Sequence, residues 1–371
     1  MTRTFPPGPK AHLPLGLEFA NKFKTDPLGT AKEMRTFGDI SHIRLGPWEW
    51  YHLNSPELIK DAFVTESTIF GKTDRFKKIL GKTDRFKKIL GTVDGNGLVL
   101  SEGEFWLRQR RIIQPSFRHE KLADYATIMI AKADAIVDKW SDGSKLDLSD
   151  EMTSLTLSII SKILFGIDVG DEAKRLGDAV TTISNCLYRE FSDIILFPEW
   201  IPLPSKIEKH QAVAVLDELI SKAISQSEAH PDAATMIASI LAAVDSEGDG
   251  TGMTKLQARD EAITMFNAGH DSTASALSWS WYLLARHNAI YDAFLAEVDA
   301  LTLTLNGAAP TLHDLAKVPL AAQIVKETLR LYPPAWTLPR QAKEEAELGG
   351  YVIPEGGLVN IFPYVIQRDA K

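Results

Sequence analysis

Residues 268–275, AGHDSTAS, place a glycine, a carboxylate and hydroxyl groups inside a stretch that otherwise has the pattern of a long helix. Thr254 and Gln257 precede it with the spacing of a capping box, and no proline interrupts the pattern as far as His287. We therefore expect a helix of roughly 50 Å, at a rise of 1.5 Å per residue, long enough to cross the molecule.

Small and polar side chains share one face of this predicted helix. At i, i+3, i+4 and i+7 spacing, the face carries Ala268, Asp271, Ser272 and Ser275. One interpretation is a close helix contact in which Asp271 pairs with a basic neighbour. The other is that Gly269 weakens the helix, Ser272 donates a hydrogen bond to the Ala268 carbonyl, and a groove opens in which carboxylate and hydroxyl relay protons.

Charged and aromatic motifs lie outside this stretch. Glu327 and Arg330 stand at i, i+3 in a predicted helix, and the apolar residues around them favour a partly buried ion pair. Trp106 and Arg110 stand four positions apart, so in a helix an indole N–H and a guanidinium would point in the same direction. Such a pair is suited to binding an anion, and a solvated basic helix is the alternative. Arg340 is a further candidate for the same anion.

The composition is that of an ordinary globular protein. The chain has 371 residues, 44% hydrophobic and 24% charged, and its net charge of −8 does not indicate nucleic-acid binding. No apolar run of about 18 residues and no signal peptide occur, so we expect a cytoplasmic protein with no membrane anchor. The single cysteine, Cys186, excludes a disulfide framework and a cysteine-rich zinc site, and we predict no metal ligand.

Helical periodicity dominates residues 103–345. Alternation over residues 39–58 predicts a hairpin around Gly46 and Pro47, followed by a helix that begins near Ser55. Residues 346–366 predict further short strands. We therefore expect a mainly α fold with a small β-sheet region, as a single domain over residues 1–371.

The decapeptide GKTDRFKKIL occurs at residues 71–80 and again at residues 81–90. Two copies are too few for a solenoid, so we interpret the repeat as a duplication that inserts surface residues. The loop entropy of ten extra residues lowers the folding stability by an amount on the order of 1 kcal/mol. Its Gly-Lys-Thr triplets lack the earlier glycine of a phosphate-binding loop, since Glu66 and Phe76 stand there.

Taken together, these motifs resemble those of the cytochrome P450 family of haem-thiolate monooxygenases, and the soluble bacterial members most of all. AGHDST is similar to the family's oxygen-activation motif, with Asp271 at the acid position and Ser272 where threonine is usual. Glu327 and Arg330 match its Glu-x-x-Arg pair, and Trp106 matches its Trp-x-x-x-Arg motif together with Arg110. The likeness covers essentially the whole chain.

The resemblance implies a cytochrome P450-like fold, a haem cofactor and the insertion of one oxygen atom from O2 into a small apolar organic substrate, with electrons from a ferredoxin or flavin reductase. It implies three groups of site residues. Asp271, Ser272 and Thr273 would be catalytic; Trp106, Arg110, Arg340, Ala268 and Gly269 would hold haem; Phe266, Ala335, Trp336 and Leu338 would line the substrate pocket, ordinary core being the alternative. Arg108 and Arg111 are candidates for contact with an acidic redox partner, with a solvated helix face as the alternative.

The sequence departs from the family pattern in two respects. Compared with the usual threonine, Ser272 keeps the hydroxyl but lacks a methyl group. We therefore expect the proton relay to work, with a less restricted side-chain rotamer and an altered coupling of oxygen use to product formation. The family's loop with the iron-ligand cysteine does not occur, and Cys186 cannot replace it because Tyr188 stands where that loop has glycine. We therefore expect no turnover from this exact chain, and the alternative function is an inactive relative that binds an apolar ligand or haem weakly.

Overall fold

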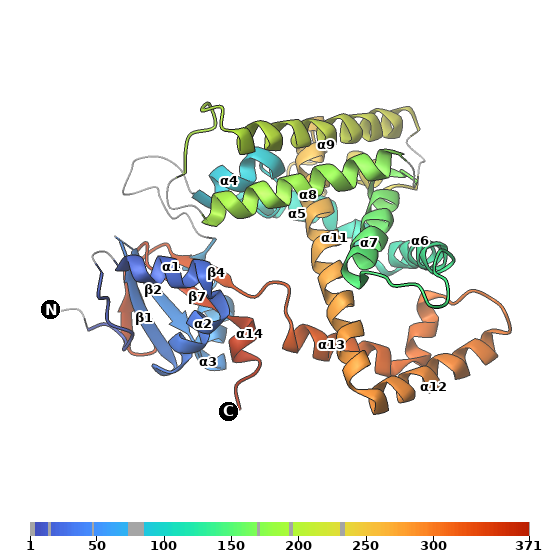
Figure 1. The fold of residues 1–371 in the computed structure, drawn as a ribbon. Helices are drawn as coiled ribbons and strands as arrows, with labels where there is room; N and C mark the ends of the chain where they lie inside the picture. The colour runs from blue at the N-terminus through green and yellow to red at the C-terminus, as the bar shows by residue number, and fades with distance from the viewer. Residues whose placement is uncertain are drawn as a thin grey trace. The chain divides into compact units, whose positions relative to one another are not determined.

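The computed structural model describes residues 4–13, 16–46, 48–72, 85–168, 171–192, 196–230 and 234–370. Most of the duplicated segment, residues 73–84, lies outside the described residues. The chain divides into two compact units, one made of residues 1–88 and 329–371 and the other of residues 89–328. The fold is mainly helical with a small sheet, as the sequence predicts (Figure 1). The single domain over residues 1–371 stays a prediction.

The first unit is built around a five-stranded sheet of order β1-β2-β7-β4-β3. The strands are β1 (Ile40–Leu45), β2 (Trp48–Leu53), β3 (Phe70–Gly71), β4 (Leu338–Ala342) and β7 (Leu358–Ile361), and β5 (Ala346–Leu348) pairs with β6 (Tyr351–Ile353). The predicted hairpin is confirmed, since β1 and β2 pair antiparallel with Leu45 opposite Trp48. β2 and β7 run parallel, which joins the two ends of the sequence in one sheet.

Short helices complete the first unit. They are α1 (Leu17–Thr25), α2 (Pro27–Arg35), α3 (Pro56–Lys60), the π-helical turn η2 (Asp61–Thr65) and α14 (Pro363–Ile366). α3 begins where the sequence predicts, because the Ser55 hydroxyl accepts a hydrogen bond from the Leu58 N–H at 3.2 Å. The core of this unit includes Tyr51, Phe70 and Val359, which are buried in one cluster.

The second unit is helical. Its elements are α5 (Gly103–Ile113), η3 (Gln114–Phe117), α6 (His119–Val137), α7 (Leu148–Phe165), α8 (Asp171–Ser192), α9 (Pro204–Ala229), α10 (Met236–Ala242), α11 (Lys255–Arg286), α12 (Asn288–Leu305) and η4 (Leu312–Lys317). Two further helices, α4 (Arg85–Asp94) and α13 (Pro319–Leu331), belong partly to each unit, since residues 85–88 and 329–331 are assigned to the first. α11 packs against α7, and α8 lies beside α9 (Figure 1). In the described part of the chain, no helix is both long and apolar enough to span a membrane.

A buried ion pair joins α8 to α9. Lys209 is fully buried and its Nζ lies 2.7 Å from Glu190 Oε1 and 3.3 Å from Glu199 Oε1. Lys206 also reaches Glu199, at 2.9 Å, and donates to the Phe197 carbonyl at 2.6 Å. Because a charge without a partner is costly in the interior, these contacts fix how α9 lies against the end of α8.

We predict that Lys209→Ala lowers the free energy of unfolding by about 3–5 kcal/mol, because it leaves the buried Glu190 carboxylate without its cation. The control is Arg175→Ala, which removes an exposed pair with Glu218 between the same two helices and should cost less than about 1 kcal/mol. Urea denaturation of both variants measures the difference. Equal losses would show that the buried pair has no special weight.

Candidate active site

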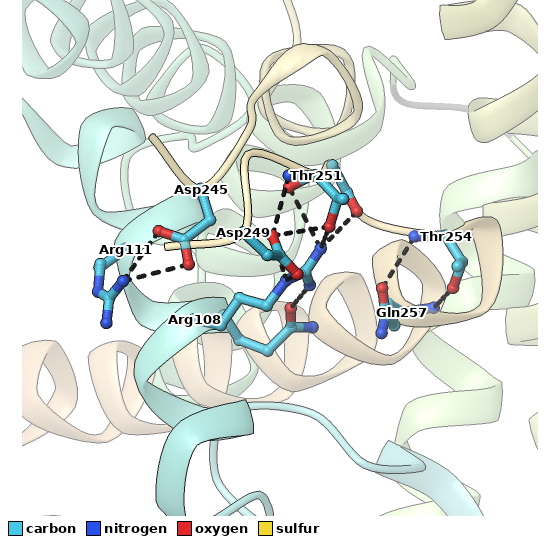
Figure 2. A network of polar contacts seen from close by, with 9 residues as sticks. Arg108, Arg111, Asp245, Asp249, Thr251, Thr254 and Gln257 are labelled. Atoms are coloured by element: carbon cyan, nitrogen blue, oxygen red, sulfur yellow. Dashed lines mark hydrogen bonds and ion pairs between the residues drawn. The ribbon is translucent and has the colours of Figure 1, made fainter. Parts of the chain in front are cut away.

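The helix predicted around AGHDSTAS is α11, and its start and end agree with the sequence analysis. The Thr254 hydroxyl accepts a hydrogen bond from the Gln257 N–H at 3.2 Å, and Gln257 Oε1 accepts one from the Thr254 N–H at 2.9 Å (Figure 2). The capping box is therefore confirmed. The helix then runs without interruption to Arg286.

The Ser272 hydroxyl donates to the Ala268 carbonyl at 2.7 Å, which confirms the predicted hydrogen bond. The backbone stays α-helical around it, so the bond is accommodated within a regular helix. The interpretation in which Gly269 weakens the helix is not what the structure shows, since α11 is continuous through residues 255–286. Instead, a Cβ at Gly269 would lie 3.0 Å from Cδ1 of Ile160 on α7. Its missing side chain lets α11 approach α7 closely.

Asp271, Ser272 and Thr273 are all exposed, as is Ala268. Asp271 forms no ion pair with a described residue. Of the first interpretation, the close helix contact occurs, at Gly269 against α7, but the pairing of Asp271 with a basic neighbour does not occur among the described residues. The carboxylate of Asp271 and the hydroxyl-bearing residue Ser272 are consecutive, exposed residues of α11.

Trp106 and Arg110 are brought together on α5. The Arg110 guanidinium lies 5.1 Å from the centre of the Trp106 ring, a cation–π contact that confirms their common face. In the first unit, Arg340 on β4 lies 4.8 Å from the Phe63 ring centre, and its Nη1 donates to the Pro339 carbonyl at 2.9 Å. Burial lowers the pKa of Arg340. No described carboxylate forms an ion pair with either arginine, so both are suited to an external anion.

The partly buried pair predicted for Glu327 and Arg330 is wrong in its burial. Both residues are exposed on α13. Two of the three apolar neighbours on which the prediction rested are exposed as well, Val325 by 43% and Leu329 by 40%, while Leu331 is half-buried. Arg330 Nη1 donates to the Gln367 carbonyl at 2.5 Å. This contact ties the end of α13 to the segment after α14.

The predicted pocket residues fall in different surroundings. Phe266 is 1% exposed and belongs to the core of the second unit, 6.0 Å from Phe165 between ring centres, so the core alternative describes it. In the first unit, Trp336 stacks on Phe362 at 6.0 Å, Leu338 is half-buried on β4, and Ala335 is exposed.

Arg108 and Arg111 bind the connection between α10 and α11 (Figure 2). Arg108 Nη2 donates to Thr251 Oγ1 at 2.7 Å and to the Gly252 carbonyl at 2.6 Å. Arg111 Nη1 lies 3.1 Å from Asp245, which is 3% exposed. Both guanidinium groups are engaged by the residues of this connection. Neither alternative from the sequence, a contact with an acidic redox partner or a solvated helix face, therefore describes them.

A row of polar contacts that no local sequence pattern indicates lies along the first half of α11. Asp260 Oδ2 accepts a hydrogen bond from the Asn96 N–H at 2.8 Å, and Glu261 Oε2 accepts one from the Leu98 N–H at 2.9 Å. Asn267 Nδ2 donates to Asp94 Oδ1 at 2.8 Å. Burial raises the pKa of Asp94 to about 6, although the Asn267 hydrogen bond and the charge of Arg259 lower it. These pairs are more than 160 positions apart in the sequence, so no local pattern indicates them.

Comparison with known proteins decides the family. The family model described as "Cytochrome P450" matches residues 6–371. The chain belongs to the cytochrome P450 family. It is 33% identical over 352 residues to cyclooctatin synthase of Streptomyces melanosporofaciens, covering 92% of this chain and 72% of that protein. It is 29% identical over 352 residues to pentalenene oxygenase of Streptomyces avermitilis, covering 93% and 74%.

Two further matches agree. Cyclooctat-9-en-7-ol 5-monooxygenase of Streptomyces melanosporofaciens is 30% identical over 338 residues, which are 90% of this chain and 70% of that protein. The crystal structure of the cytochrome P450DA heme domain superposes with a TM-score of 0.82 at 22% identity, covering 99% of this chain and 79% of that one, and shows that the fold is shared. This P450 is therefore a haem-dependent monooxygenase by family.

The chemistry of single residues can be compared with what a haem group needs. Arg110 in the second unit and Arg340 in the first unit each form no ion pair with a described residue, and a guanidinium of this kind is suited to a carboxylate such as a haem propionate. Cys186 does not suit the iron: it is 2% exposed, its Sγ donates to the Ser205 carbonyl at 3.3 Å, and burial raises the pKa of its thiol. The expectation that Cys186 packs as a small buried residue is confirmed.

We predict that Arg111→Ala lowers the free energy of unfolding by at least about 2 kcal/mol, because Asp245 loses its cation while buried. Arg111→Ala combined with Asp245→Asn should recover part of the loss. Chemical denaturation of the single and double variants provides the measurement. An unchanged stability in Arg111→Ala would contradict the structural role of this pair.

Asp94 predicts a pH dependence of stability. Its folded-state pKa of about 6 lies above its ordinary value of 3.8, so the folded P450 binds more protons than the unfolded chain between these values. The free energy of unfolding should therefore fall as pH rises through this window, by up to about 3 kcal/mol, and stay low above it. Asp94→Asn should lack this fall, so its stability relative to the parent should be higher at pH 7 than at pH 4. A difference independent of pH would show that Asp94 does not titrate in this range.

Proposed function

We propose that this P450 inserts one oxygen atom from O2 into a small apolar organic compound, at the side of α11 that carries Asp271 and Ser272. The observation that carries the proposal is the Ser272 hydrogen bond to Ala268 beside an exposed Asp271 that forms no ion pair with a described residue. A carboxylate that is open to solvent can take up protons, and an adjacent hydroxyl can pass them on.

The hydrogen bond sets the orientation of the relay. Ser272 Oγ–H is engaged with the Ala268 carbonyl, so the oxygen lone pairs face outward and accept a proton before the hydroxyl donates one. Asp271, on the preceding residue, exchanges protons with solvent. Thr273 follows with a second exposed hydroxyl. When bound, haem supplies the activation of O2; the chain supplies the protons at these atoms.

Electrons and substrate complete the proposal. We assign Trp106, Arg110 and Arg340 to the haem propionates, and Ala268 and Gly269 to the part of α11 nearest the haem. The electron donor is a ferredoxin or flavin reductase. Two relatives are named as oxygenases, of pentalenene and of cyclooctat-9-en-7-ol, which supports an apolar compound as the substrate of this P450 as well.

The first test is haem titration of the purified chain. We expect a Soret band, and we expect Arg340→Leu to weaken haem binding by roughly tenfold because a charge-assisted hydrogen bond is lost. A colourless protein after titration would overturn the proposal. Because the sequence predicts no turnover from these 371 residues, activity is measured on a variant that carries the family's iron-ligand cysteine loop. A haem-loaded variant of this kind that gives no product with any electron donor would favour the alternative, an inactive relative that binds haem or an apolar ligand.

The second test addresses the relay in a haem-loaded, active preparation. Asp271→Asn should slow product formation by about 10²-fold or more, the usual effect of removing a proton-transfer group. Ser272→Thr should raise the product formed per electron consumed, because the added methyl restricts the rotamer of the hydroxyl. Asp299→Asn, an exposed carboxylate on α12, is the control and should change neither quantity. Normal turnover in Asp271→Asn would remove Asp271 from the mechanism.

A further inference from the structure

Two histidines from distant parts of the sequence lie beside each other in the second unit. His119 is the first residue of α6, and His313 lies on η4, more than 190 positions later. Their ring centres are 5.7 Å apart, with an angle of 40° between the ring planes. Because α6 and η4 meet only in the folded chain, the sequence alone does not reveal this pair.

Both imidazole rings of this pair are accessible to a ligand. Both residues are exposed, and neither ring forms a hydrogen bond or an ion pair with a described residue. The neighbouring carboxylate of Asp314 is engaged elsewhere, since Lys317 Nζ donates to its Oδ1 and the Thr311 N–H donates to its Oδ2, each at 2.8 Å. A neutral imidazole carries one nitrogen lone pair, so the pair offers two nitrogen ligands that no other described group uses.

The separation of the rings agrees with what two histidines on one metal ion require. In a tetrahedral site the ion lies about 2.0–2.1 Å from each nitrogen, which places the two ring centres roughly 5 Å apart. A small rotation of either exposed side chain changes the observed 5.7 Å to this value. Imidazole is a ligand for Zn²⁺, Ni²⁺ and Cu²⁺, whereas Mg²⁺ and Ca²⁺ prefer oxygen ligands.

We infer that His119 and His313 together bind a divalent transition-metal ion of the Zn²⁺ type. Each ring supplies one nitrogen, and water completes the coordination, because the described residues contain no group of three or more His, Cys, Asp or Glu side chains suited to a metal. The ion joins η4 to the start of α6 and therefore stabilises the folded chain and not the unfolded one. No residue of α11 takes part, so the inference is independent of the proposed function.

The test is titration calorimetry of the full chain with Zn²⁺ at neutral pH. We expect His119→Ala and His313→Ala each to weaken the tightest Zn²⁺ site at least tenfold, because even the loss of a residue that only orients a metal ligand typically costs about 10–100-fold. The control, His230→Ala, removes an exposed histidine that follows α9 and should leave the Zn²⁺ affinity unchanged. Mg²⁺ should bind the parent far more weakly than Zn²⁺ does.

Thermal unfolding provides a second readout. Zn²⁺ should raise the melting temperature of the parent and of His230→Ala, and should leave that of His119→Ala and His313→Ala unchanged. Glutamine replaces alanine at either position if circular dichroism shows that the alanine variant does not fold. No Zn²⁺ binding to the parent, or equal affinity in the parent and both variants, would overturn the inference. A loss in only one of the two variants would overturn it as well, because the site requires both rings.

Discussion

Close packing of α11 on α7 is the contact on which the second unit depends. Ala258 and Ala262 are fully buried, and Gly269 would meet Ile160 if it carried a side chain. Small residues on this side let two long helices approach within the distance that a dense core requires. The polar residues of α11 therefore lie on the sides of the helix that do not face α7, and one of these sides carries Asp271.

The carboxylates on α11 decide how the segment after α4 is placed. Residues 95–98 are not part of a regular helix or strand, so their backbone N–H groups need partners, and Asp260 and Glu261 accept hydrogen bonds from two of them. Gly95 has a positive φ of 59°, and a Cβ there would lie 2.1 Å from Asp260 Oδ1. The segment can lie this close only because glycine stands at that position, and the helix thus positions Asp94 beside Asn267.

Local signals were sufficient for part of the fold and of the site. The capping box at Thr254, the back-bond of Ser272 and the pairing of Trp106 with Arg110 each depend on residues within four positions, and each prediction is confirmed. Contacts between distant residues gave no such signal, so the binding of Arg111 to Asp245 and of Asn267 to Asp94 was missed. The burial of Glu327 was predicted wrongly because apolar neighbours in the sequence show only that a helix face is able to pack against another element. They do not show that another element covers it.

The buried carboxylates of the second unit are stabilised in different ways, and the difference affects the pKa of Asp94. Glu190 has Lys209, Asp245 has Arg111, and Asp260 has Arg259 at 2.9 Å. Asp94 has a neutral amide, and burial raises its pKa to about 6. Glu261, which is fully buried, likewise accepts hydrogen bonds from neutral donors, Gln109 Nε2 at 3.3 Å and the Leu98 N–H at 2.9 Å. A neutral donor offsets the cost of burying the Asp94 carboxylate less than an adjacent cation would, and the pKa of Asp94 is raised accordingly.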